Sequence, residues 1–219
     1  MSVSVIIPAY NAERFIGGAV SSCWRQTLRP EVVVVDDGST DMTAEIAATL
    51  GARLIPLGRN YGAAHALNVG IESAESKYVS ILAADDRFIP EDKLQRQVEA
   101  MELEGADLSY YRMLRKAGRT HDYFTSDWPL LLALYVRNPI NGSSVMLRRD
   151  GFDRYGWFDA ELRNQDPDGD LWIRWVKGGA RVVQLDGAGT FYNVHGGQSS
   201  KKRLAWYAAM AKVRLRNLA

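Results

Sequence analysis

The chain has 219 residues, of which 47% are hydrophobic and 24% are charged, which is enough to bury one sizeable core. A formal net charge of +1 argues against the strongly basic surface of a general nucleic-acid-binding protein. The single cysteine, Cys23, excludes an internal disulfide framework, favours a reducing compartment, and sits in an apolar pattern that predicts a buried, unreactive thiol.

Strands and helices alternate over the first hundred residues. The β-branched run Val3–Ile7 ends at Pro8 and predicts a buried strand. Apolar side chains at helical spacing follow it in "AERFIGGAVSSCWRQ". The same reading predicts further strands at 31–40, 53–57 and 77–84, and helices at 12–26, 41–52, 62–74 and 90–105, with Asp41 as an N-cap and Gly51 as a stop.

The pattern is less regular after residue 107. "DLSYYRML", "SSVMLRR", "ARVVQL" and "TFYNVH" read as four strands, and "PDGDLWIRWVKGG" reads as a helix. "WPLLLALYV" is too short to cross a bilayer and predicts a core helix. The N-terminus lacks the basic start and cleavage site of a signal peptide, so we expect a cytoplasmic protein.

Alternating strands and helices of this length predict an α/β fold with a doubly wound, mostly parallel sheet. Ligands of such sheets bind beyond the carboxyl ends of the strands. We expect a nucleotide-binding half at 1–106, an acceptor-side half at 107–200 that extends the same sheet, and a basic amphipathic helix at 201–219.

Three polar clusters stand at the ends of predicted strands: "PAYN" (8–11), "DDGSTD" (36–41) and "ADDR" (84–87). Each alone is explained by turns and helix caps. A parallel sheet, however, would bring all three to one edge, which favours a binding site. Asp85 and Asp86 repel one another, and a bound divalent cation would offset that repulsion.

Nucleotide and metal chemistry fits these residues. A carboxylate accepts a hydrogen bond from the imide N–H of uracil, and Tyr10 offers a ring for stacking on a base. Another carboxylate can hold a hard cation that also binds a diphosphate. The chain contains neither the glycine-rich dinucleotide motif after its first strand nor a P-loop, so those two modes of phosphate binding are disfavoured.

"VSVIIPAYN", "VVVVDDGSTD", "NYGAAHALNVGIESAESKYVSILAADD", "DLWIRW" and "YNVHGGQSS" resemble, in this order, the motifs of inverting glycosyltransferases of family 2, which have the GT-A fold. The resemblance extends over residues 3–200 and is strongest in the first hundred. It implies a metal-dependent inverting transfer of a sugar from a nucleotide sugar, with UDP as the expected nucleotide and Mg²⁺ or Mn²⁺ as the cofactor.

The resemblance also implies roles for individual residues. Asp37 would accept from the base imide, with Asp36 more structural, and Asp85 would contact the ribose or the sugar. Asp86 would bind the metal, and His195 matches a histidine that meets the metal or the diphosphate, although a structural role for a lone histidine is an equal alternative. The remaining nucleotide-site residues would be Pro8, Ala9, Tyr10, Asn11, Gly62, Asn68 and Ala84.

The catalytic base is expected in "NQDPDGDLWIRW". Relatives show Glu-Asp-x-Asp-Leu-Trp, and alignment on Leu171 and Trp172 puts Asp168 at the base position and Pro167 where Glu is expected. Asp166 is the alternative base, and helix capping is the competing explanation for both. A second departure from the family is Leu67, where many relatives have Arg.

The acceptor is expected to meet the second half, at Asn141, Gly142 and Trp157, although core packing of Trp157 is the slightly favoured alternative. A saccharide or glycolipid acceptor in cell-surface polysaccharide or glycolipid synthesis would suit the family. The alternatives are a sugar-nucleotide nucleotidyltransferase, which usually has a glycine-rich basic loop that "PAYNAERF" lacks, and a nucleotide-sugar-binding protein that has lost its base.

The tail at 201–219 contains six Lys or Arg and no acid. Its apolar residues Leu204, Tyr207, Ala211, Leu215 and Leu218 fall on one helical stripe. This stripe packs on the domain in the favoured interpretation. In the other interpretation it meets anionic lipid as a peripheral contact at the inner face of the membrane.

Overall fold

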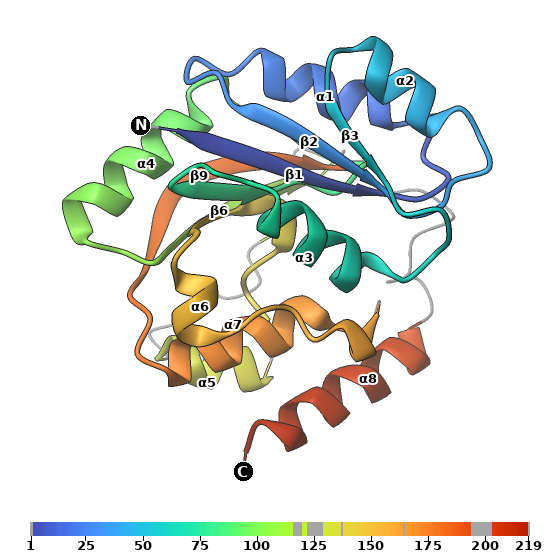
Figure 1. The fold of residues 1–219 in the computed structure, drawn as a ribbon. Helices are drawn as coiled ribbons and strands as arrows, with labels where there is room; N and C mark the ends of the chain where they lie inside the picture. The colour runs from blue at the N-terminus through green and yellow to red at the C-terminus, as the bar shows by residue number, and fades with distance from the viewer. Residues whose placement is uncertain are drawn as a thin grey trace.

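A computed structural model describes residues 2–115, 120–121, 129–136, 138–163, 165–193 and 203–218. Its centre is a sheet with helices on both faces (Figure 1). In chain order the elements are β1 (Val3–Ala9), α1 (Ile16–Trp24), β2 (Glu31–Asp36), α2 (Thr43–Thr49), β3 (Arg53–Pro56), α3 (Ala63–Glu72), β4 (Tyr78–Ile81), β5 (Arg87–Phe88), α4 (Lys93–Glu104), β6 (Leu108–Arg115), β7 (Thr120–His121), α5 (Leu130–Val136), the 3₁₀ turn η1 (Gly142–Ser144), β8 (Val145–Arg148), α6 (Gly151–Tyr155), the 3₁₀ turn η2 (Ala160–Leu162), α7 (Pro167–Lys177), β9 (Val182–Tyr192) and α8 (Arg203–Arg216).

The strands lie in the order β3-β2-β1-β4-β8-β6-β9-β5, with β7 paired to β6. β3, β2, β1 and β4 are parallel neighbours, as the alternating pattern of the first half predicted. β8 runs antiparallel to both β4 and β6, so it joins the second half to the same sheet. The predicted α/β fold is confirmed, and one sheet continues through both halves.

Two apolar cores cover the two faces of the sheet. Successive residues of a strand point to opposite faces, so Ile6 of β1 packs with α3, α5, α6 and α7, while Val5 and Ile7 pack with α1 and α4. Both faces are therefore dry, and the strands read as unbroken apolar runs. The thiol of Cys23 is fully buried in the second core, as predicted, and burial raises its pKa to about 12.

The prediction of two strands at 180–185 and 190–195 is wrong, because β9 is one strand across the "DGAG" segment. Between the two predicted strands the chain forms a bulge, where the pairing of β6 and β9 shifts register near Tyr110 to Met113. Gly187 has a positive φ of 90°, which glycine adopts without strain. A Cβ at Gly189 would lie 2.6 Å from the ring of Tyr111, so β9 passes too close to β6 for a larger residue.

The predicted helices are present, with shorter bounds. Asp41 precedes the N-cap of α2 by one residue, and its carboxylate accepts a hydrogen bond from the Thr43 N–H at 3.0 Å. The apolar stretch at 128–136 forms α5, whose Ala133 and Leu134 are buried. Among the helices of the described residues, none is both long and apolar enough to span a membrane.

The helix predicted for the tail is present as α8, but the predicted packing stripe is wrong. Leu215 and Leu218 are 68% and 65% exposed. The buried face instead carries Met210, Val213, Arg214 and Asn217. The contacts of Leu204 and Tyr207 lie outside the described side chains.

Polar contacts hold α8 against the domain, beside α7 (Figure 1). Arg216 bridges Asp159 at 2.6 Å and Asp170 at 2.8 Å. Asn217 donates to Asp170 at 3.0 Å, and Arg214 donates to the carbonyl of Leu134 at 3.1 Å. Arg216, and Arg214 through Asp166 at 3.5 Å, therefore neutralise acids of the domain, while Leu215 and Leu218 face outward.

Asp170→Asn is expected to lower the free energy of unfolding by about 2–3 kcal/mol, because the fully buried carboxylate also pairs with Arg174 at 2.8 Å and joins α7 to α8. Urea titration followed by circular dichroism measures this loss. Asp153→Asn, on the exposed side of α6, is the matched control and should change little. Equal stabilities of the two variants would show that the Asp170 junction does not hold α8.

Candidate active site

The loops that follow β1, β2 and β4 meet at one edge of the sheet. Ala9 pairs with Asp36, and the Asp37 N–H donates to the Ala9 carbonyl at 2.8 Å. β4 lies on the other side of β1, where the Leu82 N–H donates to the Ile6 carbonyl at 3.1 Å. The three polar clusters therefore share one edge, as the parallel order predicted.

Asp37 is buried and organises the loop before α3. Its two carboxylate oxygens accept from the backbone N–H groups of Tyr61 at 2.7 Å and Gly62 at 2.8 Å. Gly62 has a φ of 98°, and a Cβ there would lie 2.9 Å from the Cβ of Arg163. A carboxylate has about four lone-pair sites, so Asp37 keeps acceptor capacity for a ligand. Asp36 closes its own turn by accepting from the Ser39 N–H at 3.2 Å.

Tyr10 and Asn11 extend the end of β1 beyond Pro8 and the buried Ala9. The Tyr10 side chain is exposed and lies next to the Asp36–Asp37 turn in the sheet register. Asn11 adopts a φ of 49° and accepts from the Thr40 N–H at 2.9 Å, while its own N–H donates to Ser39 Oγ at 2.9 Å. Asn11 thus locks two loops together, and Tyr10 is left as the exposed ring at this edge.

The turn Ala84–Asp86 links β4 to β5. The Asp86 N–H donates to the Ala83 carbonyl at 3.0 Å, and the Asp86 side chain is buried. Its Oδ1 accepts from the Asn193 N–H at 3.2 Å. Burial, and then the charge of Asp85, raise the pKa of Asp86 to about 7, while hydrogen bonds from Ser143 and Asn193 oppose the rise.

Two adjacent carboxylates, one of them buried, suit a hard divalent cation that takes further oxygen ligands from a diphosphate and from water. The chemistry of this donor pair therefore fits the predicted metal. Within the ranges that the structure describes, no cluster of three or more His, Cys, Asp or Glu side chains could hold a metal by itself. His195 lies outside the described residues.

Asp168 lies in the first turn of α7, against η1. The Gly142 N–H donates to its carboxylate, and a Cβ on Gly142 would lie 2.6 Å from Asp168 Oδ2. Burial raises the pKa of Asp168 to about 6, although its side chain stays partly accessible. Asn141 caps η1 through a 2.9 Å bond from the Ser143 N–H. The structure thus brings the predicted base beside Asn141 and Gly142.

Asp166 is placed differently, although it is only two residues away. Its backbone is left-handed, with a φ of 57°, and its buried Oδ2 lies 3.5 Å from Arg214 Nη1 of α8. Burial and the charge of Asp168 raise its pKa to about 7, and Arg214 opposes this. Asp166 therefore faces a cation of the C-terminal helix, whereas Asp168 faces η1.

Two predicted site residues make packing contacts within the domain. The Asn68 amide donates to the Phe158 carbonyl at 2.8 Å and accepts from the Phe158 N–H at 3.1 Å, so its side chain joins α3 to the second half. The Trp157 ring packs on Phe152, with centroids 5.2 Å apart, at the edge of the first core. Leu67 is buried in the same core.

Two residues near the site were missed in the sequence. Ser143 accepts from the Ala83 N–H at 3.0 Å and also bonds to Asp86, so it connects η1 to the acidic turn. Arg163 binds the Asn60 carbonyl at 3.3 Å and packs on Gly62. Ser143 stands in the segment "NGSS", which was assigned only to the acceptor side, and no local pattern marks Arg163.

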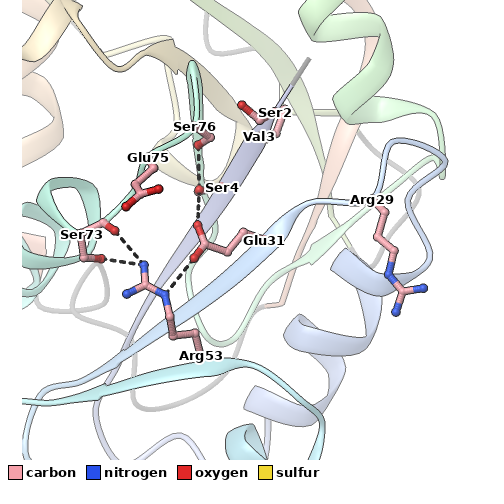
Figure 2. Close-up of a pocket in the computed structure, with 9 residues that line it drawn as sticks. All are labelled: Ser2, Val3, Ser4, Arg29, Glu31, Arg53, Ser73, Glu75 and Ser76. Carbon is pink, nitrogen blue, oxygen red and sulfur yellow. Dashed lines mark hydrogen bonds and ion pairs between the residues drawn. The ribbon is translucent and has the colours of Figure 1, made fainter.

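A pocket at the opposite edge of the sheet contains none of these residues (Figure 2). Two of its charged residues pair with one another, Arg53 with Glu31 at 2.8 Å, and Arg53 also donates to the Ser73 carbonyl at 3.0 Å. The Ser4 hydroxyl donates to Glu31 at 2.6 Å. The candidate active site is therefore the edge at which the acidic turns meet.

The sequence profile of Glycosyl transferase family 2 matches residues 4–168. The Escherichia coli protein "UDP-Glc:alpha-D-GlcNAc-diphosphoundecaprenol beta-1,3-glucosyltransferase WfaP" is 30% identical over 209 residues, covering 92% of this chain and 80% of its own. An uncharacterized glycosyltransferase of Rickettsia prowazekii is 30% identical over 188 residues, covering 80% of this chain, and the aligned region spans only 58% of that relative.

Solved structures are similar over nearly the whole chain. Staphylococcus aureus TarS 1-349 in complex with UDP-GlcNAc superposes with a TM-score of 0.80 and 24% identity, covering 97% of this chain and 65% of that one. The mannosyltransferase PcManGT of Pyrobaculum calidifontis, in complex with GDP-Man and Mn²⁺, has a TM-score of 0.74 and 20% identity, covering 98% and 70%.

Proposed function

Since the chain belongs to glycosyl transferase family 2 and has the GT-A fold, we propose that it transfers a sugar from a UDP-sugar to a hydroxyl group, with inversion and with the help of a divalent metal ion. The observation that carries this proposal is that Asp86 and Asp168 bind to neighbouring residues of η1. Asp86 accepts a hydrogen bond from Ser143, and Asp168 accepts one from the Gly142 N–H. Metal-binding and base groups would then flank one reacting centre.

Asp168 is proposed as the general base. A sugar hydroxyl is a weak nucleophile, so removal of its proton by a positioned carboxylate assists attack. In the proposed reaction the hydroxyl oxygen forms a bond to the anomeric carbon as its proton passes to Asp168. The bond from that carbon to the diphosphate breaks on the opposite face, and UDP leaves with the electron pair.

Asp86, with Asp85 beside it, is proposed to hold Mg²⁺ or Mn²⁺. Such an ion, when bound, stabilises the negative charge that grows on the leaving diphosphate. Asp86 contributes a buried oxygen donor whose orientation is set by Ser143 and Asn193. His195 stays a proposal of the family resemblance.

A saccharide or glycolipid is the proposed acceptor class. WfaP is named for a diphosphoundecaprenol-linked acceptor, and this chain covers most of its length. Contact of α8 with a membrane surface forms part of the proposal, supported by the outward-facing Leu215 and Leu218. The proposed site of action is the cytoplasmic face of the membrane.

UDP is expected to bind more tightly than ADP by about 1.5–3 kcal/mol, roughly 10- to 100-fold in Kd, because the uracil imide donates to the Asp37 carboxylate and adenine has no imide. Titration calorimetry with Mn²⁺ measures both constants. GDP serves as the intermediate case, since guanine has an imide on a larger ring system, and we expect it to bind more weakly than UDP. Equal Kd values for UDP and ADP would remove Asp37 from the base-recognition role.

A further inference from the structure

A lysine that contacts no carboxylate among the residues the structure describes is buried behind the active site. Lys93 is the first residue of α4 and is 0% exposed. Its ammonium contacts Gln97 Oε1 at 2.6 Å, Ser80 Oγ at 3.5 Å and the face of the Phe88 ring at 4.1 Å. Burial lowers the pKa of Lys93 to about 7. Burying an ammonium group in this way costs stability, so its presence points to a role other than holding the core together.

The contact with Lys93 helps to set which way the Gln97 amide points. An ammonium group only donates hydrogen bonds, so the oxygen of Gln97 has to face it. The NH₂ group of the fully buried Gln97 is therefore directed to the Ser144 carbonyl at 3.1 Å and to Ser109 Oγ at 3.2 Å. The Ser109 carbonyl, which accepts from the same NH₂ group at 3.3 Å, favours this orientation too, so Lys93 and the two carbonyls hold the Gln97 amide from opposite ends.

Ser144 belongs to η1, the three-residue segment between the two acidic groups. The preceding residue, Ser143, bonds to the Ala83 N–H and to Asp86. The residue before Ser143, Gly142, donates its backbone N–H to the carboxylate of Asp168. A small shift of η1 would therefore move the contacts of both carboxylates at once.

We propose that Lys93 and Gln97 are positioning residues, which hold η1 through the Ser144 carbonyl and thereby fix Asp86 and Asp168 relative to each other. The effect of this pair on catalysis rests on the proposed function. Its effect on the order of η1 does not depend on that function.

Lys93→Met tests this role, because the thioether fills the space over Phe88 without a charge. We expect the melting temperature to stay the same or to rise, since an unpaired buried charge is removed. We nevertheless expect the Mn²⁺-dependent affinity for UDP and the turnover of sugar transfer each to fall roughly tenfold, as when a residue that orients a metal ligand is lost. A merely structural lysine would lower the melting temperature and leave affinity and turnover unchanged.

Val98→Ala is the matched control. Val98 is buried on the same helix, in the apolar core that also contains Phe88, and its side chain can make no hydrogen bond to η1. Its truncation should lower the melting temperature and leave UDP affinity and turnover at the values of the wild type. Gln97→Met removes the donor to Ser144 and should lower both as Lys93→Met does. The double variant should lose about as much as one single variant, roughly tenfold rather than a hundredfold, because residues of one network do not act additively.

Hydrogen exchange of the ligand-free protein separates the two proposals. Amides of residues 142–146 should exchange faster in Lys93→Met and Gln97→Met, with the rest of the sheet unchanged. If the wild type fails to bind UDP while this exchange rises, the proposed function is wrong and the ordering of η1 by the pair stands. If the wild type binds UDP and Lys93→Met matches it in affinity, turnover and exchange, the positioning role is wrong. If neither variant folds, the pair is a folding element, and the proposal is equally wrong.

Discussion

Asp168→Asn is expected to lower the turnover of sugar transfer by roughly 10²-fold or more, the range for losing a positioned general base. Asparagine has the same shape and can still accept from the Gly142 N–H, so α7 and η1 should keep their places. UDP affinity should be almost unchanged, because Asp168 lies against η1 and not at the Asp37 turn. Steady-state rates and calorimetry together measure this split between turnover and binding.

The pH profile of the wild type should carry the mark of the same residue. Only the ionised carboxylate accepts a proton, and burial raises the pKa of Asp168 to about 6. Turnover should therefore rise as the pH passes upward through about 6, and this limb should vanish from the residual activity of Asp168→Asn.

Asp166→Asn is the control for the position of the base. It should act mainly on stability, since it leaves Arg214 in a buried setting without its ion partner at 3.5 Å. If Asp166→Asn is the inactive variant and Asp168→Asn keeps its turnover, the base is Asp166, and the alignment across Pro167 is wrong by two residues.

Asp86→Asn is expected to abolish the part of UDP binding that depends on metal. The variant should bind UDP in Mn²⁺ no better than the wild type binds it in EDTA, because a neutral amide is a poor ligand for a hard cation. The Asn193 N–H can still bond to the amide oxygen, so the turn at 83–86 should be preserved.

Removal of this buried charge should also stabilise the metal-free protein. The adjacent carboxylates Asp85 and Asp86 repel, and Asp86 is almost fully buried. A gain of about 1 kcal/mol would raise the melting temperature by about 2–4 °C for a chain of this size. Asp153→Asn, at an exposed site, should do neither. Wild-type enhancement of UDP affinity by Mn²⁺ in Asp86→Asn would show that another group is the principal metal ligand.

The edge that gathers the acidic turns was predictable because parallel strands fix it. Once β1, β2 and β4 are read as parallel neighbours, their carboxyl ends must lie together, and so must Tyr10, Asp37 and Asp86. The contact of Asp168 with Gly142 joins segments 26 residues apart, and only the register over Leu171 and Trp172 hinted at it.

The packing of α8 was mispredicted because helical periodicity identifies an apolar stripe but not its partner. The surface facing α8 includes Asp159, Asp166 and Asp170, which bind arginines better than leucines. The polar face of the helix therefore turned inward. Similarly, an asparagine inside a family motif does not reveal that the backbone of Phe158 lies opposite it.

The burial of Lys93 and Gln97 on α4 could have been predicted from the helical periodicity of the sequence. Lys93 and Gln97 are four residues apart and continue the line of the buried Leu94, Val98 and Met101. Polar residues on the buried stripe of a helix demand partners inside the protein. The sequence does not show which partner this is. Gln97 of α4 reaches the Ser144 carbonyl of η1 because β8 inserts antiparallel into the sheet, and no local pattern predicts that insertion.

Release of UDP from a panel of UDP-sugars, measured with Mn²⁺ and with EDTA, tests the central claim most directly. The proposed enzyme should slowly hydrolyse at least one UDP-sugar in Mn²⁺, lose that activity in EDTA, and lose it again in Asp168→Asn, where UDP still binds. Binding of UDP without release from any donor by the wild type, or release that is the same in EDTA and in Asp168→Asn, would contradict a metal-dependent transfer with Asp168 as its base.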